Sequence, residues 1–304
     1  MGETREAGLR FQEEMSYKMD MVFPSEEWVQ TLVSQALKED VGRGDVSTVI
    51  SVDASDTGRA QVVSRQEGVV AGLPLLEMVF GQVDPAVMVD TLLADGTHVE
   101  PGMVVARLEG PVGSILTGER TALNFLQHLG GIASLTARYV KEAAGTGCRV
   151  LDTRKTLPGY RSLAKYAVLC GGGYNHRLGL YDRIMLKDNH WAAAAGSMES
   201  MVARARRDYP DLAVEIEVDT LDQLDQILAL QVDWILLDNF TVQETTEAVK
   251  RRDAAGVETL LESSGNITLE TIAQYARAGV DGASVGRITH SAGALDLGLD
   301  LEPS

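Results

Sequence analysis

The chain has 304 residues, and its 27 Lys and Arg against 44 Asp and Glu give a formal net charge of −17 at pH 7. This acidic balance argues against a nucleic-acid-binding protein, which usually carries a broad basic face. The charged first residues are unlike a signal peptide, and no apolar stretch is long enough to predict a membrane span. The two cysteines, Cys148 and Cys170, predict neither a zinc site nor a disulfide framework. We therefore expect a cytoplasmic protein with no nucleic-acid and no membrane partner.

The first third of the sequence predicts an α+β domain. Residues 1–21 are strongly charged and predict a flexible N-terminal extension, and residues 24–40 predict a helix. Residues 58–110 predict short strands between turns, with Asp95-Gly96 as a hairpin signal between two of them. This pattern favours a mostly antiparallel sheet.

From about residue 119 the pattern changes to strands that alternate with helices. An amphipathic helix is predicted at 119–144, although Gly130-Gly131 weakens its middle. The predicted strands after it are 148–153, 183–188, 213–219, 234–239, 259–265 and 282–286. Capping-box spacings, which begin helices just after two of these strands, are Thr220 with Gln223 and Thr241 with Glu244. Six strand-then-helix units predict a parallel sheet that is closed, or nearly closed, into a barrel.

Polar side chains follow nearly every predicted barrel strand. In a β/α barrel the carboxyl ends of the strands converge on one mouth, where active sites lie. Helix capping explains one such residue, but it does not readily explain six groups in series. The groups are Asp152 to Lys155, Lys187 to Asn189, Glu217 to Asp219, Asp238-Asn239, Ser263 to Asn266 and Gly286-Arg287.

The segment 149–190 is basic within an acidic chain. It holds eight Lys and Arg and three acidic residues, whereas the rest of the chain holds 19 basic and 41 acidic residues. Arginine forks and lysine point charges bind carboxylates and phosphates, so this segment predicts a small, highly charged anionic substrate. The candidate ligands are Arg154, Lys155, Arg177 and Lys187, with His176 as a further donor. The plainer interpretations are surface solubility for the cations and a structural role for the histidine.

Two acids and one glycine-containing loop complete the predicted site. Glu217 and Asp238 end apolar strands, and carboxylates at a barrel mouth suit Mg²⁺ that bridges to substrate phosphates. Helix N-capping is the alternative role for such acids. The loop Ser264, Gly265 and Asn266 precedes a predicted helix at 268–278, and its backbone N–H groups are suited to a phosphate.

At these residues the sequence resembles the quinolinate phosphoribosyltransferases. The resemblance covers about residues 24–300. Its segments include EDVGRGDVST (39–48), GERTALNFLQHLGGIAS (118–134), LDTRKTLPGYR (151–161), GGGYNHRLGLYDRIMLKDNH (171–190), ESSGNI (262–267) and GASVGRITH (282–290). Gly130 departs from the family pattern, in which we expect a serine.

The resemblance implies an incomplete α/β barrel of the type II phosphoribosyltransferase kind beside an N-terminal α/β sandwich domain. The sandwich domain would comprise residues 22–124 and 288–304, and the barrel residues 125–287. The family reaction joins quinolinate to phosphoribosyl pyrophosphate and yields nicotinate mononucleotide, pyrophosphate and CO₂, with Mg²⁺. The implied assembly is at least a homodimer with shared active sites, and a hexamer is the larger alternative.

The resemblance also implies a role for each site residue. Those for quinolinate are Arg120 from the partner subunit, Thr153, Arg154, His176, Arg177 and Lys187. Those for phosphoribosyl pyrophosphate are Lys155, Glu217, Asp238, Ser264, Gly265, Asn266 and Gly286. Glu217 and Asp238 would hold Mg²⁺, and catalysis would fall to these two acids with Lys155 and Lys187.

Three other functions stay open at this point. A nicotinate phosphoribosyltransferase has one substrate carboxylate to bind, whereas the separate groups His176-Arg177 and Arg120 beside Arg154 favour two. A related protein associated with molybdate transport shares the expected fold. A sensor of phosphorylated sugars would not need the paired acids Glu217 and Asp238. Analysis of the products formed from quinolinate and phosphoribosyl pyrophosphate distinguishes these alternatives.

Overall fold

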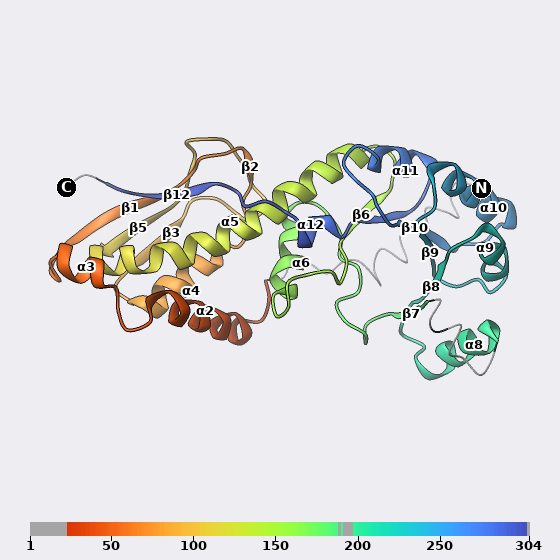
Figure 1. Cartoon of the computed structure of the whole chain (residues 1–304), viewed down its shortest axis with the longest axis horizontal. Coiled ribbons are helices and arrows are strands. Elements are labelled where there is room, and N and C mark those ends of the chain that lie inside the picture. Colours follow the sequence, from red (N-terminus) through yellow and green to blue (C-terminus); the bar gives the residue numbers. More distant parts are fainter. Residues whose placement is uncertain (1–22, 188–189, 191–196, 303–304) are drawn as a thin grey trace. The chain divides into compact units, whose positions relative to one another are not determined.

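The computed structural model describes residues 23–187, 190 and 197–302 (Figure 1). The described chain divides into two compact units. The N-terminal unit comprises 23–137, Ser162–Gly172 and 291–302, and the barrel unit comprises Arg138–Arg161 and Gly173–His290. The predicted extension 1–21 lies outside the described residues.

An antiparallel sheet forms the centre of the N-terminal unit, as the sequence predicts. Its strand order is β12-β1-β5-β3, so the last strand of the chain pairs with the first. The strands are β1 (Thr57–Ser64), β3 (Met88–Thr91), β5 (Val104–Pro111) and β12 (Leu297–Leu301), and a separate pair joins β2 (Gly68–Val69) to β4 (His98–Val99). The helices are α2 (Glu26–Val41), α3 (Val46–Ser51), α4 (Pro74–Val83), α5 (Val112–Ala143), which continues into the barrel unit, and α6 (Arg161–Cys170).

The hairpin prediction at Asp95-Gly96 is wrong. Gly96 turns with φ +86°, but the strand before the turn pairs with β5 and the strand after it pairs with β2. The Asp95 carboxylate accepts hydrogen bonds from the Leu73 amide at 3.0 Å and the Tyr166 hydroxyl at 2.6 Å. These bonds tie the turn to other parts of the unit, and the next strand leaves the first sheet.

The barrel unit contains a six-stranded parallel sheet with the order β6-β11-β10-β9-β8-β7. Since β6 and β7 lie at its two edges, the barrel is incomplete, and the expected fold class is confirmed. The strands are β6 (Arg149–Leu151), β7 (Ile184–Leu186), β8 (Val214–Val218), β9 (Trp234–Asp238), β10 (Leu260–Ser264) and β11 (Gly282–Ser284). Each lies inside the range that the sequence predicts.

Helices cover one face of the parallel sheet (Figure 1). They are α8 (Met198–Asp208), α9 (Leu221–Leu228), α10 (Val242–Ala255) and α11 (Ile272–Ala278). The short helix α12 (Arg287–His290) follows β11 in the chain. Alternate strand residues such as Ile216, Ile235 and Leu261 form the apolar core against these helices. Thr241 and Glu244 begin α10 with a complete capping box, as predicted. The opposite strand face therefore carries the charged residues.

The described part of the chain has no helix long and apolar enough to cross a membrane. Cys148 and Cys170 are both free.

Close backbone packing explains Gly131 in the middle of α5. A Cβ atom there would lie 1.8 Å from the carbonyl oxygen of Gly293, which belongs to the same unit. Gly130 is less constrained, because its added Cβ would meet mainly the side chain of Leu295. The glycine pair thus allows the returning C-terminal segment to lie against the helix.

We predict that Gly131→Ala lowers the free energy of unfolding by about 3 kcal/mol or more, because neither backbone can move without losing packing. Gly81→Ala in α4 is the matched control, since an added Cβ there meets nothing within 4 Å. It should stabilise the protein by about 0.5–1 kcal/mol. Urea unfolding of both variants measures this difference, and equal stabilities would contradict the packing argument.

Candidate active site

The carboxyl edge of the parallel sheet collects the predicted acids and the predicted phosphate loop. Asp238 lies opposite Ser264 in the pairing of β9 with β10, and Glu217 lies opposite Leu236 in the pairing of β8 with β9. Because side chains alternate along a strand, Glu217, Asp238 and Ser264 share the face turned away from the covering helices. Sequence reasoning therefore placed these three residues correctly at one edge.

Lys187 and Glu217 form an ion pair at this edge. Lys187 directly follows β7, and β7 pairs with β8, which carries Glu217. The Lys187 side chain is 39% exposed and that of Glu217 is 11% exposed, so a charged ligand can still reach the ammonium group. The pair combines the predicted substrate cation with a predicted metal ligand.

A network of amide side chains links Asp238 to the loop after β10. The Asn239 side chain donates to Asp238 at 2.7 Å, and the Asn266 side chain donates to Asn239 at 3.3 Å. Gly265 has φ +92°, and a Cβ on it would lie 2.2 Å from the Asn239 oxygen. This loop conformation therefore requires glycine at 265, and it holds the 264–266 backbone beside the acid.

Lys155 approaches a second glycine loop, which follows β11. A Cβ on Gly286 would lie 3.1 Å from the Cδ of Lys155. The Lys155 backbone is held by an N–H donated to Thr153 Oγ1 at 3.0 Å and by its carbonyl, which accepts from Thr289 at 2.8 Å. The structure thus brings Thr153, Lys155 and Gly286 together, as the sequence predicts.

Two predicted arginines lie close enough to repel each other. Burial, together with the charge of Arg154, lowers the pKa of Arg177. The Nε of Arg154 is buried and has no hydrogen-bond partner among the described residues. The charges of Glu215 and Asp182 oppose this shift without cancelling it, so the site keeps an excess of positive charge that a bound anion would offset.

Arg161, which was not among the predicted ligands, braces this arginine pair. Its guanidinium donates to the Leu178 carbonyl at 2.9 Å and to the Arg154 carbonyl at 3.4 Å. The loops that carry Arg154 and Arg177 are therefore fixed to each other. Arg120 belongs to the N-terminal unit, where its side chain is 57% exposed.

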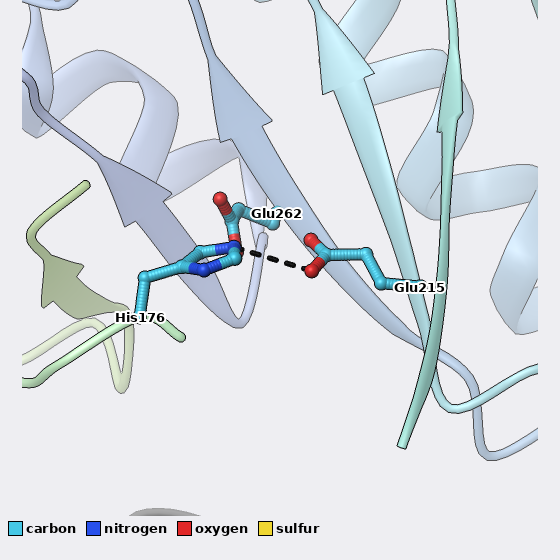
Figure 2. Close-up of side chains that lie close together, drawn as sticks. All are labelled: His176, Glu215 and Glu262. Carbon is cyan, nitrogen blue, oxygen red and sulfur yellow. Dashed lines mark ion pairs between the residues drawn. The ribbon is translucent and has the colours of Figure 1, made fainter. Parts of the chain in front are cut away.

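His176 belongs to a buried group of charged side chains that the sequence analysis did not predict (Figure 2). Its Nε2 lies 3.2 Å from Glu215 Oε2 and 3.6 Å from Glu262 Oε2, and the three side chains are 7%, 0% and 0% exposed. Arg183 pairs with Glu215 at 3.1 Å and lies over the Trp234 ring. We call His176, Arg183, Glu215 and Glu262 the buried cluster. Its only sequence signal is an acid inside each of two apolar strands.

The pKa values within the buried cluster move in opposite directions. Burial alone raises the pKa of Glu215, but His176 and Arg183 lower it to about 2. Burial also raises the pKa of Glu262, and Glu215 adds to the shift against the effect of His176, so that it reaches about 7. Burial lowers the pKa of His176, and Glu262 and Glu215 together raise it overall, but Glu262 contributes to this rise only while it is ionised. One proton shared by His176 and Glu262 therefore makes the cluster neutral.

Two contacts show which residue holds this proton. The Nδ1 of His176 accepts the Arg177 amide hydrogen at 2.7 Å, which a ring protonated on both nitrogens cannot do. Glu262 has little hydrogen bonding around it, with Ser284 as a weak donor and His176 Nε2 at 3.6 Å, and a neutral carboxyl tolerates this better than a carboxylate. We therefore assign the proton to Glu262 and a neutral ring, with its hydrogen on Nε2, to His176.

This tautomer also decides against a metal in the buried cluster. His176, Glu215 and Glu262 are residue types that bind metals, and their ligand atoms all lie within 4.8 Å of one another. A metal on Nε2 would need that nitrogen without its hydrogen, while Nδ1 is already an acceptor. The cluster is therefore better described as a hydrogen-bonded charge group.

Comparisons with known proteins agree with this geometry. The family model described as the C-terminal domain of quinolinate phosphoribosyl transferase matches residues 132–300, and the N-terminal domain model matches 45–130. The chain belongs to the quinolinate phosphoribosyltransferase family.

Relatives of this family cover most of the chain. A nicotinate-nucleotide pyrophosphorylase [carboxylating] of Mycobacterium leprae is 44% identical over 88% of this chain and 95% of its own length. A probable enzyme of the same name from Synechocystis is 41% identical over 90% of this chain and 91% of its own length. The solved nicotinate-nucleotide pyrophosphorylase of Francisella tularensis has a TM-score of 0.87 and 38% identity, and the match covers 91% of this chain and 97% of that one.

The assignment of the proton to Glu262 predicts a pH effect on stability. The folded-state pKa of about 7 lies above the ordinary value of 4.5. The stability that this group contributes is therefore complete below about pH 4.5 and is lost as the pH rises through 7. Glu262→Gln mimics the neutral carboxyl, so the variant should become more stable relative to wild type as the pH rises. Urea unfolding between pH 4.5 and 8 checks this, and a difference that does not change with pH would contradict it.

Proposed function

We propose that this protein transfers the phosphoribosyl group from phosphoribosyl pyrophosphate to quinolinate with loss of CO₂, and so makes nicotinate mononucleotide for NAD biosynthesis. The observation that carries the proposal is the part-buried pair Arg154 and Arg177, in which burial and the charge of Arg154 lower the pKa of Arg177 although Glu215 and Asp182 oppose the shift. Two adjacent guanidinium groups suit a dicarboxylate better than a monocarboxylate. The family membership of the chain supports the same substrate.

In the proposed mechanism the protein mainly positions charges. Arg154 and Arg177 hold the carboxylates of quinolinate and orient its ring nitrogen toward C1′ of the ribose. Lys155 and Lys187 stabilise the negative charge that develops on the departing pyrophosphate. The 264–266 loop and Gly286 hold the 5′-phosphate through backbone N–H groups. No general base is needed, because the attacking nitrogen has no proton to lose.

Decarboxylation follows from the chemistry of the product ring. Once its nitrogen carries the ribose, the ring is a pyridinium, and the positive nitrogen stabilises the electron pair left at C2 when CO₂ departs. C2 then takes up a proton from water, which completes nicotinate mononucleotide. The protein has only to keep the carboxylate at C2 in place and exclude water until CO₂ has departed. Arg154, which lies in the braced loop beside Arg177, is suited to that task.

Product analysis tests the function directly. With quinolinate, phosphoribosyl pyrophosphate and Mg²⁺, we expect CO₂ and nicotinate mononucleotide in equal amounts. Nicotinate in place of quinolinate should give little or no nucleotide, because one of the two arginines would then lack a carboxylate. Turnover of nicotinate but not of quinolinate would overturn the proposal in favour of a nicotinate phosphoribosyltransferase.

We also propose that Glu217 and Asp238 bind Mg²⁺ together with the substrate pyrophosphate. Two carboxylates on adjacent strands fit a hard cation that keeps several waters. Lys187 already pairs with Glu217. We therefore infer that Mg²⁺ enters the site together with the substrate phosphates. When bound, Mg²⁺ would neutralise charge on the leaving pyrophosphate.

Activity should therefore disappear with EDTA and return with Mg²⁺ or Mn²⁺. Glu217→Gln and Asp238→Asn should each cripple turnover, whereas Asp219→Asn, at an exposed position just beyond β8, is the control and should not. Steady-state rates at several Mg²⁺ concentrations measure this. Full activity of the Glu217→Gln, Asp238→Asn double variant in EDTA would exclude the two-acid site.

The proposed assembly is a cytoplasmic homodimer, or a larger oligomer built from it, in which Arg120 completes the quinolinate site of the partner subunit. The exposed guanidinium of Arg120 is available for such a role. The two free cysteines agree with a reducing compartment.

Subunit mixing tests the shared site. Arg120→Ala and Lys187→Ala should each be inactive alone, but exchange of their subunits gives heterodimers with one intact site. Activity should approach about a quarter of wild type, since about half the dimers are mixed and each has one good site of two. If mass spectrometry confirms exchange and no activity returns, Arg120 acts within its own subunit.

A further inference from the structure

Both ring nitrogens of His176 are already occupied by the protein. Nδ1 accepts the Arg177 amide hydrogen at 2.7 Å, and Nε2 faces Glu215 and Glu262 at 3.2 and 3.6 Å. The side chain is 7% exposed. A ring in this position offers no free atom to a bound anion, which differs from the direct contact with quinolinate that the family resemblance implies.

The contacts of His176 instead fix the backbone that carries Arg177. The His176 amide donates to the buried Asp152 carboxylate at 2.8 Å, and the ring accepts the next amide of the chain. The Arg177 guanidinium donates to the Arg183 carbonyl at 3.5 Å, just before β7. The protein interior thus holds two successive backbone amides, and the Arg177 guanidinium lies near enough to Arg154 to be affected by its charge.

The two glutamates in turn fix the ring. Glu215 is held by Arg183, whose guanidinium carbon lies 5.6 Å from the centre of the Trp234 ring. Glu215 and Trp234 lie opposite each other in the pairing of β8 with β9, on the inner face of the sheet. Figure 2 shows His176 reaching from its loop to Glu215 and Glu262, which project from β8 and β10. The ring is therefore clamped between two strands that are not neighbours in the sheet, and rotation would break contacts on both sides.

We propose that the buried cluster positions Arg177 for the quinolinate carboxylate, and that His176 acts through the Arg177 backbone and not on the substrate itself. This inference rests on the proposed function, because it assigns Arg177 to quinolinate. His176, Glu215 and Glu262 are positioning residues in this scheme. Their effect belongs to the binding of quinolinate and not to that of phosphoribosyl pyrophosphate.

Two substitutions of His176 separate the two ring nitrogens. The side-chain oxygen of His176→Asn takes the place of Nδ1 and can still accept the Arg177 amide. The longer side chain of His176→Gln places its polar group near Nε2 and loses the acceptor at Nδ1. We expect the KM for quinolinate to rise by about tenfold or more in His176→Gln, because a buried amide without an acceptor is costly. The rise in His176→Asn should be smaller, because this variant keeps the acceptor for the Arg177 amide and loses only the contacts with Glu215 and Glu262. The KM for phosphoribosyl pyrophosphate should stay within about twofold in both.

A double-mutant cycle with Arg177→Ala gives the decisive comparison. If His176 acts only through Arg177, His176→Gln adds nothing to the KM for quinolinate once Arg177 is alanine. If the two effects multiply, or if His176→Gln binds quinolinate better than His176→Asn, His176 contacts the substrate and the inference is wrong.

Loss of folding is controlled separately. Arg252→Met removes another buried arginine of the barrel unit, which pairs with Asp281 at the amino end of β11, away from the site. It should lower the free energy of unfolding while leaving both KM values unchanged. Calorimetric binding of quinolinate to every variant gives a measurement independent of turnover, including for a variant too unstable for kinetics at higher temperature.

The wild-type protein distinguishes failure of the inference from failure of the function. If wild type neither binds nor converts quinolinate, the proposed function fails and the inference fails with it. If wild type is active but the two histidine variants raise both KM values equally, the function stands and the positioning role is overturned.

Discussion

Two glutamates buried on the inner face of a parallel sheet must be neutralised without water, and the active edge of this barrel is built around that requirement. Glu215 and Glu262 are completely inaccessible to solvent. An unpaired carboxylate in such a place would be too costly to retain. Arg183 balances the charge of Glu215, and a proton neutralises Glu262. The buried cluster that supports the charged residues at the sheet edge is therefore neutral.

This arrangement connects the interior of the barrel to its mouth. Glu215 and Glu217 lie two residues apart on β8, and therefore on the same face of the strand. The first holds the buried cluster and the second pairs with Lys187 at the edge. On β10, Glu262 and Ser264 are likewise two residues apart and share the same face of the strand. Each strand thus supplies an interior charge for support and a polar residue at its end for the ligand.

The excess positive charge of the site is connected with the neutrality of the buried cluster. The buried cluster is neutral as a whole, and burial together with the charge of Arg154 lowers the pKa of Arg177 even though Glu215 and Asp182 oppose the shift. A site of this kind binds an anion strongly because the cost of holding the cations together is already met in the folded protein. The rigid support of the arginines is therefore part of the proposed binding of quinolinate.

The sequence was sufficient to predict the barrel strands and the residues at their carboxyl ends, because apolar runs that end in polar groups have few other interpretations. It was insufficient where long-range packing decides the structure. Helix α5 begins at Val112, earlier than predicted, since the unfavourable Gly113 and Gly118 are accepted for close packing, against Phe80 in the case of Gly118. The partners of His176 lie on strands far away in sequence, so its burial could not be inferred from its neighbours.

The protonation state of His176 tests the central claim most directly. The chain has five histidines, so ¹⁵N-histidine labelling gives few signals, and His176→Asn identifies the one that belongs to His176. At pH 6, below the pKa of about 7 for Glu262, we expect a neutral ring with Nε2 protonated and Nδ1 unprotonated, in agreement with a neutral Glu262 and the Arg177 amide on Nδ1. A ring protonated on both nitrogens, or one that carries its hydrogen on Nδ1, would contradict the account of the buried cluster and of its support for Arg177.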